Sequence, residues 1–284
     1  MMTELPHHAS APPGTTALGA FIARHRRLFV LTGAGCSTAS GIADYRDEAG
    51  AWKRVPPLSH QAFMSDALLR RRYWARSMVG WRRFGAAEPN AAHHALRALE
   101  DAGQVVLLLT QNVDGLHQRA GSRRVLDLHG RLDTVRCTAC PARLPRAAMQ
   151  DWLYARNPGW LPLDAFAAPD GDADLDGLDF SGFDVPPCPQ CGGVLKPDVV
   201  FFGEHVPRER VERAFEALEA ADAVLVVGSS LMVYSGYRFV QAAAHQGKPI
   251  AAVNLGRTRA DALLSLKLTQ ACEEALAFLL HRPV

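Results

Sequence analysis

Four short apolar runs rich in β-branched residues stand out in the pattern of hydrophobic and polar positions along the chain. Each is bounded by Gly, Asn or Thr, and together they cover Leu28–Thr32, Val105–Thr110, Ala223–Val227 and residues 250–254. Continuous apolar runs of this length are typical of strands buried on both faces of a parallel sheet. The pattern therefore predicts a parallel sheet built on these four runs.

Helical periodicity lies between the predicted strands. Directly before the third run, one helix face carries apolar residues at the i, i+4, i+7 spacing: Val211, Phe215 and Leu218. Asn90 is a candidate N-cap for a helix that buries Leu96 and Leu99. Alternating strands and helices predict an α/β fold, a doubly wound Rossmann-like parallel sheet whose ligands bind at the carboxyl ends of the strands.

Two segments interrupt this alternation. Residues 44–89 have a helical pattern, and residues 136–195 are rich in Pro, Gly and Asp and hold four of the six cysteines. Within the second segment, residues 164–184 contain seven Asp and no Lys or Arg, which predicts a solvated excursion. Its start resembles a calcium-binding loop, but Phe183 stands where a bidentate Glu is required, so we expect no calcium site.

Composition and charge restrict the class of protein. The 284 residues are 48% apolar and 21% charged, which is globular composition and excludes general disorder. The net charge of +2 gives no strong field toward nucleic acid or anionic lipid. No apolar run is long enough to span a membrane, and the first 27 residues lack the apolar region of a secretory signal. We expect a cytoplasmic protein with no nucleic-acid and no membrane partner.

The cysteine spacing is the most specific pattern in the chain. Cys137 and Cys140 form one Cys-x-x-Cys knuckle, and Cys188 and Cys191 form a second. Two such knuckles complete a four-thiolate tetrahedral zinc site, and four filled positions leave no room for an activated water. The sequence therefore predicts one structural Zn²⁺. Two disulfides are the alternative, which a reducing compartment disfavours.

Polar loops follow the predicted strands. In the order in which the strands occur along the chain, they are Gly33-Ala34-Gly35, Gln111-Asn112-Val113-Asp114, Gly228-Ser229-Ser230 and Asn254-Leu255-Gly256. Glycines after a strand let the backbone approach a pyrophosphate. The first loop alone is a weak signal, because Thr38 replaces the third glycine of the dinucleotide fingerprint and a structural turn has a similar sequence. Four such loops at one sheet edge favour a dinucleotide site.

His129 is a candidate general base, because histidine suits proton removal from a sugar hydroxyl near neutral pH. It lies between a short apolar run and the first knuckle. His117 is the competing candidate, and it is equally suited to fixing the Asp114 loop by a hydrogen bond.

A set of motifs spanning about residues 20–280 resembles the NAD-dependent protein deacylases called sirtuins. In chain order they are GAGCSTASGIADYR, TQNVDGLHQRAG, LHG directly before CTAC, CPQCGG, KPDVVFFGE, VVGSSLMV and VNLG. RYWAR, VGW and SGYRF resemble the class II branch, which includes the mitochondrial sirtuin 4 and its bacterial relatives. The order of the motifs makes chance agreement negligible.

The resemblance implies two domains. Residues 18–47, 90–130 and 197–284 would form the large NAD-binding domain. The helical insert 48–89 and the zinc-binding module 131–196 would form the small domain, with an acyl-lysine tunnel between the two.

The resemblance also implies roles for residues that match the family motifs. His129 and Asn112 would be catalytic, with His129 as general base. The cofactor side would comprise Gly33, Ala34, Gly35, Asp44, Tyr45, Arg46, Gln111, Asn112, Asp114, Gly228, Ser229, Ser230, Asn254, Leu255, Gly256 and Cys272. The peptide backbone would pair with Val200, Phe201, Gly203 and Glu204 as an added strand.

The implied activity is NAD-dependent deacetylation or deacylation of lysine in proteins or peptides. The acyl oxygen attacks the nicotinamide ribose, nicotinamide leaves, and His129 takes a proton from the ribose so that a hydroxyl can attack the imidate. The products are free lysine and O-acyl-ADP-ribose. Two alternatives remain open: a protein ADP-ribosyltransferase on the same scaffold, and a non-enzymatic zinc-ribbon module that binds nucleic acid or protein.

Three further positions carry expectations. Ala43 stands where the family most often has Pro, which should loosen the closing loop. Ser235 also replaces a common Pro, which should set the substrate-binding loop differently. Tyr73 and Arg76 lie at i and i+3 of a predicted helix, a spacing found in the sirtuin branch that removes acidic acyl groups. The pair predicts an acidic or bulky acyl group, with acetyl and a merely solvated basic helix face as alternatives.

Overall fold

The computed structural model describes residues 13–53, 58–163, 171–173, 175 and 177–281. Its larger sheet has six parallel strands in the order β3-β2-β1-β7-β8-β9. The strands are β1 (Leu28–Thr32), β2 (Val105–Thr110), β3 (Val125–Asp127), β7 (Ala223–Val227), β8 (Ile250–Val253) and β9 (Leu266–Leu268). The predicted parallel sheet is therefore confirmed, with β8 ending one residue earlier than expected, before Asn254.

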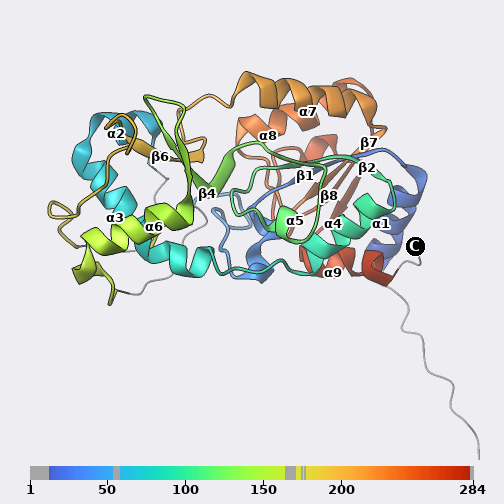
Figure 1. Ribbon diagram of the computed structural model, residues 1–284. Coiled ribbons are helices and arrows are strands. Elements are labelled where there is room, and N and C mark those ends of the chain that lie inside the picture. The colour runs from blue at the N-terminus through green and yellow to red at the C-terminus, as the bar shows by residue number, and fades with distance from the viewer. Residues whose placement is uncertain (1–12, 54–57, 164–170, 174, 176, 282–284) are drawn as a thin grey trace, which may run out of the picture.

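Helices cover both faces of this sheet (Figure 1). On one face lie α1 (Pro13–Arg24), α4 (Ala91–Asp101) and α9 (Cys272–Leu276), and on the other α7 (Arg208–Ala220) and α8 (Tyr234–His245). Side chains of β1 alternate between the two layers: Val30 packs with the first group and Phe29 with the second. Strands buried on both faces explain why the sequence shows continuous apolar runs.

Two predicted helix features are confirmed. Asn90 caps α4, since its side chain accepts a hydrogen bond from Ala92 N at 2.9 Å and His93 completes a capping box. Leu96 and Leu99 of this helix are fully buried. In α7, Leu218 is fully buried against the sheet.

A second group of elements lies at one end of the large sheet (Figure 1, left). It contains a three-stranded antiparallel sheet in the order β5-β4-β6. The elements are β4 (Gly130–Cys137), β5 (Arg143–Pro145), β6 (Leu195–Val199), α2 (His60–Ser65), α3 (Ala67–Phe84) and α6 (Arg146–Arg156). They enclose a separate hydrophobic cluster around Trp74, Met78, Met149 and Leu153. The short helix α5 (Leu116–Arg119) follows the loop after β2.

Part of the Asp-rich region is packed rather than solvated. Residues 164–170, 174 and 176 lie outside the described residues, so two of the aspartates of the calcium-like run cannot be placed. Ala173 is fully buried, and its backbone N–H donates to the Arg76 carbonyl of α3 at 3.0 Å. A side chain at Gly80 would meet the Gly171 carbonyl at 2.2 Å, so close backbone packing requires this glycine. The expectation of a solvated excursion is wrong here, because the segment docks on α3.

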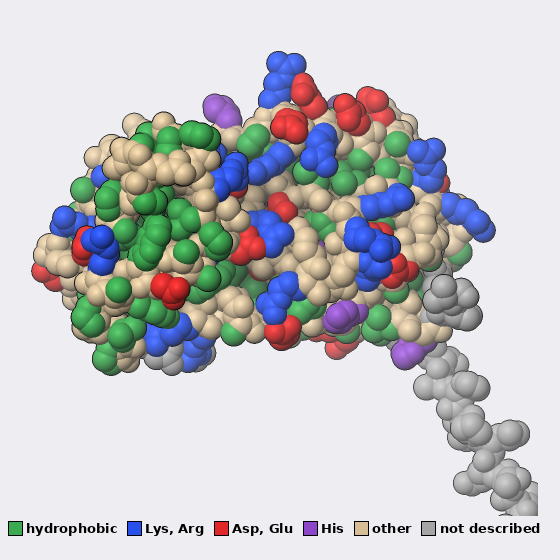
Figure 2. Space-filling model, in the orientation of Figure 1, with side chains coloured by type: hydrophobic (Ala, Val, Ile, Leu, Met, Phe, Trp, Pro, Cys, Tyr) green, Lys and Arg blue, Asp and Glu red, His purple; other side chains and the backbone are tan. Residues whose placement is uncertain are grey.

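Surface charge agrees with the small net charge. On the face shown in Figure 2, Lys and Arg side chains are interspersed with Asp and Glu. Among the described residues, no helix combines the length and the apolar character that crossing a membrane requires.

Candidate active site

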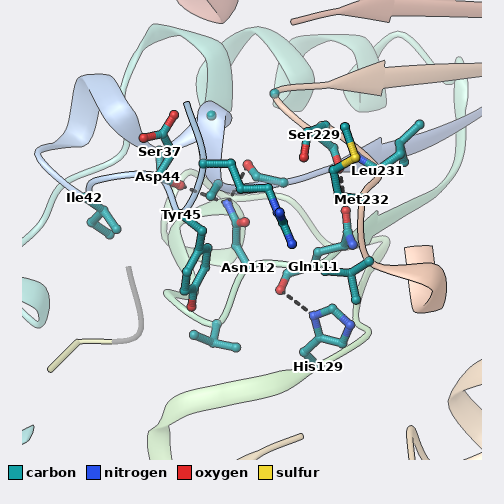
Figure 3. A pocket seen from close by; sticks show the side chains of 18 of the residues that line it. Ser37, Ile42, Asp44, Tyr45, Gln111, Asn112, His129, Ser229, Leu231 and Met232 are labelled. Carbon is teal, nitrogen blue, oxygen red and sulfur yellow. Dashed lines mark hydrogen bonds between the residues drawn. The ribbon is translucent and has the colours of Figure 1, made fainter. Parts of the chain in front are cut away.

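One cavity of about 440 Å³ lies at the carboxyl ends of the central strands (Figure 3). All residues predicted for the cofactor side line it, as do His129 and five of the six predicted substrate residues: Tyr73, Val200, Phe201, Gly203 and Glu204. Arg76 is absent from the lining. The four loops predicted to lie at one edge of the sheet therefore surround one cavity. The role of each residue in binding or catalysis stays a prediction.

The glycines after β1 and β7 allow two loops to touch through their backbones. Gly35 N donates to the Gly228 carbonyl at 2.8 Å. A Cβ at Gly33 would lie 2.8 Å from Ser229 Cβ, and one at Gly228, where φ is +63°, would lie 2.2 Å from Cys36 N. Larger residues are excluded at these positions. After Gly33 the chain forms two short 3₁₀ turns, Ala34–Cys36 and Thr38–Ser40, instead of a long helix.

A polar network joins this loop to the one after β2. Ser37 donates to Asp114 Oδ2 at 2.8 Å and accepts from Asn112 Nδ2 at 3.0 Å. The same Asn112 amide donates to the Gly33 carbonyl at 3.0 Å. Burial raises the pKa of Asp114, while its hydrogen bonds oppose that shift. Sequence reasoning missed Ser37 as a site residue, although its place inside the GAGCS motif was a usable signal.

His129 is held through three of its atoms. Its Nδ1 lies 2.9 Å from the Gln111 carbonyl (Figure 3), and its Nε2 lies 2.8 Å from Ser235 Oγ. Its own carbonyl accepts from Val200 N at 2.8 Å. A carbonyl only accepts hydrogen bonds, so Nδ1 carries the proton and Nε2 is unprotonated, with its lone pair directed at the Ser235 hydroxyl. Burial lowers the pKa of His129 to about 4, more than the Gln111 carbonyl raises it, so the ring is neutral at neutral pH.

His117, the competing base, is buried beneath the loops and does not line the cavity. Its Nε2 lies 2.9 Å from Thr32 Oγ1 at the end of β1. Cys36 and His93 lie beside it, close enough for the three ligand atoms to share an ion. However, His93 Nδ1 accepts from Asn90 N at 3.2 Å, which leaves its Nε2 protonated and unable to ligate. This cluster is therefore part of the core.

The segment predicted to close over nicotinamide is folded back on itself. Asp44 pairs with Lys53, and Arg46 donates to the Gly50 carbonyl at 2.8 Å with its guanidinium 4.0 Å from the Trp52 ring centre. The tip is attached to the loop after β8, because Arg257 N donates to Glu48 O at 2.8 Å. Ala43 is exposed just before this segment, and its predicted loosening effect stays a prediction.

The predicted substrate segment is fixed by a buried cation. Lys196 is 2% exposed, and its Nζ lies 2.9 Å from Glu204 Oε2 and 4.5 Å from the centre of the Phe201 ring. Glu204 also accepts from Phe201 N at 3.0 Å. Burial lowers the pKa of Lys196, and the Glu204 carboxylate opposes this shift. The ion pair holds residues 200–204 in one conformation beside His129.

Tyr73 and Arg76, the pair predicted to contact the acyl group, do not both line the cavity. Tyr73 lines the cavity, whereas Arg76 Nε lies 4.0 Å from Asp172 Oδ2. Asp172 itself lines the cavity. The prediction that Arg76 faces the acyl end is therefore not supported, because the docked segment 171–173 brings a carboxylate to the cavity side of the arginine.

The four knuckle cysteines meet away from this cavity. Their Sγ atoms lie within 4.8 Å of one another, with Cys137 to Cys191 at 3.5 Å and Cys140 to Cys188 at 3.7 Å. Tetrahedral zinc with bonds of about 2.3 Å needs sulfur separations of about 3.8 Å, so the cluster fits Zn²⁺. Ala139 N donates to Cys137 Sγ at 3.3 Å, as expected around a thiolate ligand. None of the four cysteines lines the cavity, consistent with a structural ion.

Comparisons with known proteins identify similar chains. A model of the Sir2 family matches residues 33–235. Relatives named "NAD-dependent protein deacetylase" include one from Xanthomonas campestris pv. campestris, 69% identical over 94% of this chain and 91% of the relative. One from Bordetella bronchiseptica is 69% identical over 92% of this chain and 95% of the relative. The solved structure described as "Sir2-p53 peptide-NAD+" has a TM-score of 0.76 at 28% identity, over 94% of this chain and 97% of its own.

We expect Cys188→Ser to lose zinc and to lower the melting temperature, because three thiolates hold the ion poorly and metal binding contributes to folding free energy. Metal analysis and thermal unfolding measure both effects. Cys36→Ala is the control, since Cys36 lies outside the cluster, and it should keep its zinc. A Cys188→Ser protein with one zinc per chain would contradict the assignment.

Three neutral buried histidines should make stability depend on pH below 6.5. Burial lowers the pKa of His93 and of His129 to about 4 and that of His117 well below its usual value. Below pH 6.5 the unfolded chain takes up protons that the native chain does not, so stability falls by about 1.4 kcal/mol per pH unit for each histidine. Urea unfolding between pH 7 and pH 5 tests this. His129→Asn should reduce the slope by about a third, and an equal slope in both proteins would refute the argument.

Proposed function

The chain belongs to the Sir2 family and is an NAD-dependent protein deacetylase, with NAD as co-substrate and a structural zinc, and we propose that His129 is its general base. One observation carries this assignment: in the wall of the cavity, a neutral histidine has its Nδ1 proton fixed on the Gln111 carbonyl. Such a ring has its Nε2 lone pair available to accept a proton at neutral pH.

Each of the loops on the cofactor side would contact a different part of NAD. Gly33, Ala34 and Gly35 form a loop of small residues that would let the pyrophosphate approach the backbone, while the N–H groups of Gly33 and Gly35 donate to the carbonyls of Val227 and Gly228. Asn112 and Asp114, fixed through Ser37, would contact the nicotinamide ribose together with Gln111. The adenosine side would be formed by Ser229, Ser230, Asn254, Leu255, Gly256 and Cys272, all of which line the cavity.

The closing segment would cover the nicotinamide end of the cofactor. Asp44, Tyr45 and Arg46 all line the cavity. The attachment of Glu48 to Arg257 supports a cover that excludes water when NAD is bound.

In the proposed reaction, the acyl oxygen of the substrate lysine displaces nicotinamide from NAD, and His129 then removes a proton from the ribose. The deprotonated ribose hydroxyl attacks the acyl carbon, one water adds to that carbon, and its bond to the lysine nitrogen breaks, so the acyl group ends on ADP-ribose and the lysine amine is released. The chain positions the groups and moves one proton, and the zinc takes no part because its cysteines lie outside the cavity. Asn112 assists by holding the loop that faces the ribose.

Acyl-lysine proteins or peptides are the substrates, and residues 200–204 would pair with their backbone as an added strand. The similar solved structure described as "Sir2-p53 peptide-NAD+" supports a peptide substrate. The separate hydrophobic clusters support the division into a large domain (18–47, 90–130, 197–284) and a small one (48–89, 131–196). The motifs RYWAR, VGW and SGYRF support class II, and a zinc site built from four thiolates fits a reducing, cytoplasmic location.

Neutral acyl groups should be preferred over acidic ones. Asp172 brings a carboxylate to the cavity and pairs with Arg76, so a succinyl carboxylate would meet repulsion where a free arginine would attract it. Tyr73 and Phe201, whose ring centres lie 5.4 Å apart, supply apolar surface for an acetyl or other uncharged group. This proposal replaces the acidic preference that the Tyr-x-x-Arg spacing suggested.

We expect His129→Ala to lower the deacetylation rate by about 100-fold to 10,000-fold, because it removes the proposed base. Zinc content and NAD binding should be unchanged. His245→Ala is the matched control, since His245 is exposed at the end of α8. Near wild-type turnover in His129→Ala would refute the role of His129, and retention of radiolabelled ADP-ribose on protein would favour a transferase.

Asp172→Asn should raise the ratio of succinyl to acetyl kcat/KM by about tenfold or more, because it frees Arg76 to bind a carboxylate. Adding Arg76→Met to Asp172→Asn should reverse this gain. Steady-state assays of one peptide carrying either acyl group measure the ratio. An unchanged ratio in Asp172→Asn would show that this end of the cavity does not contact the acyl group.

A further inference from the structure

Ser235 contacts the atom of His129 that the reaction uses. Its Oγ lies 2.8 Å from His129 Nε2, and it lines the same cavity. Because Nδ1 already donates to Gln111, Nε2 is an acceptor, and the Ser235 hydroxyl must be the donor in this bond. The proline that often occupies this position in sirtuins has no hydroxyl and provides no such bond.

The first turn of α8 contacts one nitrogen of the His129 ring and Gln111 contacts the other, and these two segments pack on each other. A Cβ at Gly236 would lie 2.5 Å from Gln111 Nε2, so the first turn of α8 packs directly on Gln111. Arg238 Nε donates to the Ser235 carbonyl at 3.0 Å and fixes this turn. The Gln111 side chain is itself fixed, because its Oε1 accepts from Ser229 Oγ at 2.6 Å. The hydroxyl of Ser235 is thus placed by the same packing that places the Gln111 carbonyl.

The charges acting on the ring do not favour its protonated form. Those that bear on His129 are the guanidinium groups of Arg238 and Arg210, and both lower its pKa. An imidazolium formed during proton transfer needs a partner that accepts a hydrogen bond. A serine hydroxyl can bond to the neutral ring as a donor and to the charged ring as an acceptor, because it rotates between the two roles. Its hydrogen bond to the charged ring is stronger than its bond to the neutral ring.

We propose that Ser235 is a positioning residue for the general base. It donates to Nε2 while His129 is neutral. When the ribose hydroxyl approaches, the serine O–H first turns away from the Nε2 lone pair; the ribose proton then passes to Nε2, and the serine oxygen accepts a hydrogen bond from the new N–H while keeping its own proton. One proton moves from substrate oxygen to Nε2, and no other bond to Ser235 forms or breaks. This inference rests on the proposed role of His129.

The test separates the two halves of the reaction. Release of nicotinamide precedes the use of the base, so exchange of labelled nicotinamide into NAD reports the first half and deacetylation kcat reports both. We expect Ser235→Ala to lower kcat about tenfold, with KM for NAD and the exchange rate within about twofold of wild type. Ser235→Thr keeps the hydroxyl and should restore most of kcat. Tyr234→Phe removes an exposed hydroxyl from the neighbouring residue and should change nothing.

Several outcomes would overturn the proposal. An unchanged kcat in Ser235→Ala would overturn it, and so would a failure of Ser235→Thr to recover kcat. An equal fall in the rates of exchange and deacetylation in Ser235→Ala would also overturn it, because that result would show a merely structural role. The double variant with His129→Ala should be no slower than His129→Ala alone, because Ser235 acts only through the ring. A fully active His129→Ala would instead refute the base assignment itself, which keeps the two failures distinguishable.

Discussion

The site depends on direct backbone contact between the ends of two parallel strands. Gly35 N bonds to the Gly228 carbonyl at 2.8 Å, and Gly33 N bonds to the Val227 carbonyl at 3.1 Å. This contact brings the loops after β1 and β7 within reach of Asn112, whose amide bonds to Gly33 at 3.0 Å. Because side chains at these glycines would collide with backbone, small residues here determine whether the polar loops can form one cavity at all.

Most of the larger sheet could be predicted because burial on both faces leaves a clear local signal. Three of the four apolar runs match β1, β2 and β7 residue for residue, and Asn90 caps α4 as expected. The cysteine knuckles were equally clear, since spacing alone restricts which thiolates can share an ion. The short strands β3 and β9 were not predicted, because three residues give too little periodicity.

Contacts between distant segments could not be predicted from pattern. The Asp-rich region read as solvated because its composition is polar, yet Ala173 and Leu175 are buried in the cluster around Trp74. Arg76 has a helix position that suits an acyl pocket, and only the docking of Asp172 shows that its charge is paired. Ser235 is similar: the sequence shows a departure from proline, and the structure shows that the new hydroxyl reaches Nε2 of a histidine 106 residues earlier in the chain.

The zinc cluster and the base lie at opposite ends of one strand pair. β4 runs from Gly130, directly after His129, to the zinc ligand Cys137, and it pairs with β6 at both of its ends, with a register shift between Arg131 and Val135. None of the four cysteines lines the cavity, so the ion does not act on the reaction itself. β6 continues into Val200, whose N–H binds the His129 carbonyl at 2.8 Å. A structural ion at one end of the β4–β6 pair therefore stabilises the position of both His129 and the peptide-binding segment at the other end. The ion influences activity by positioning these residues and takes no part in the reaction.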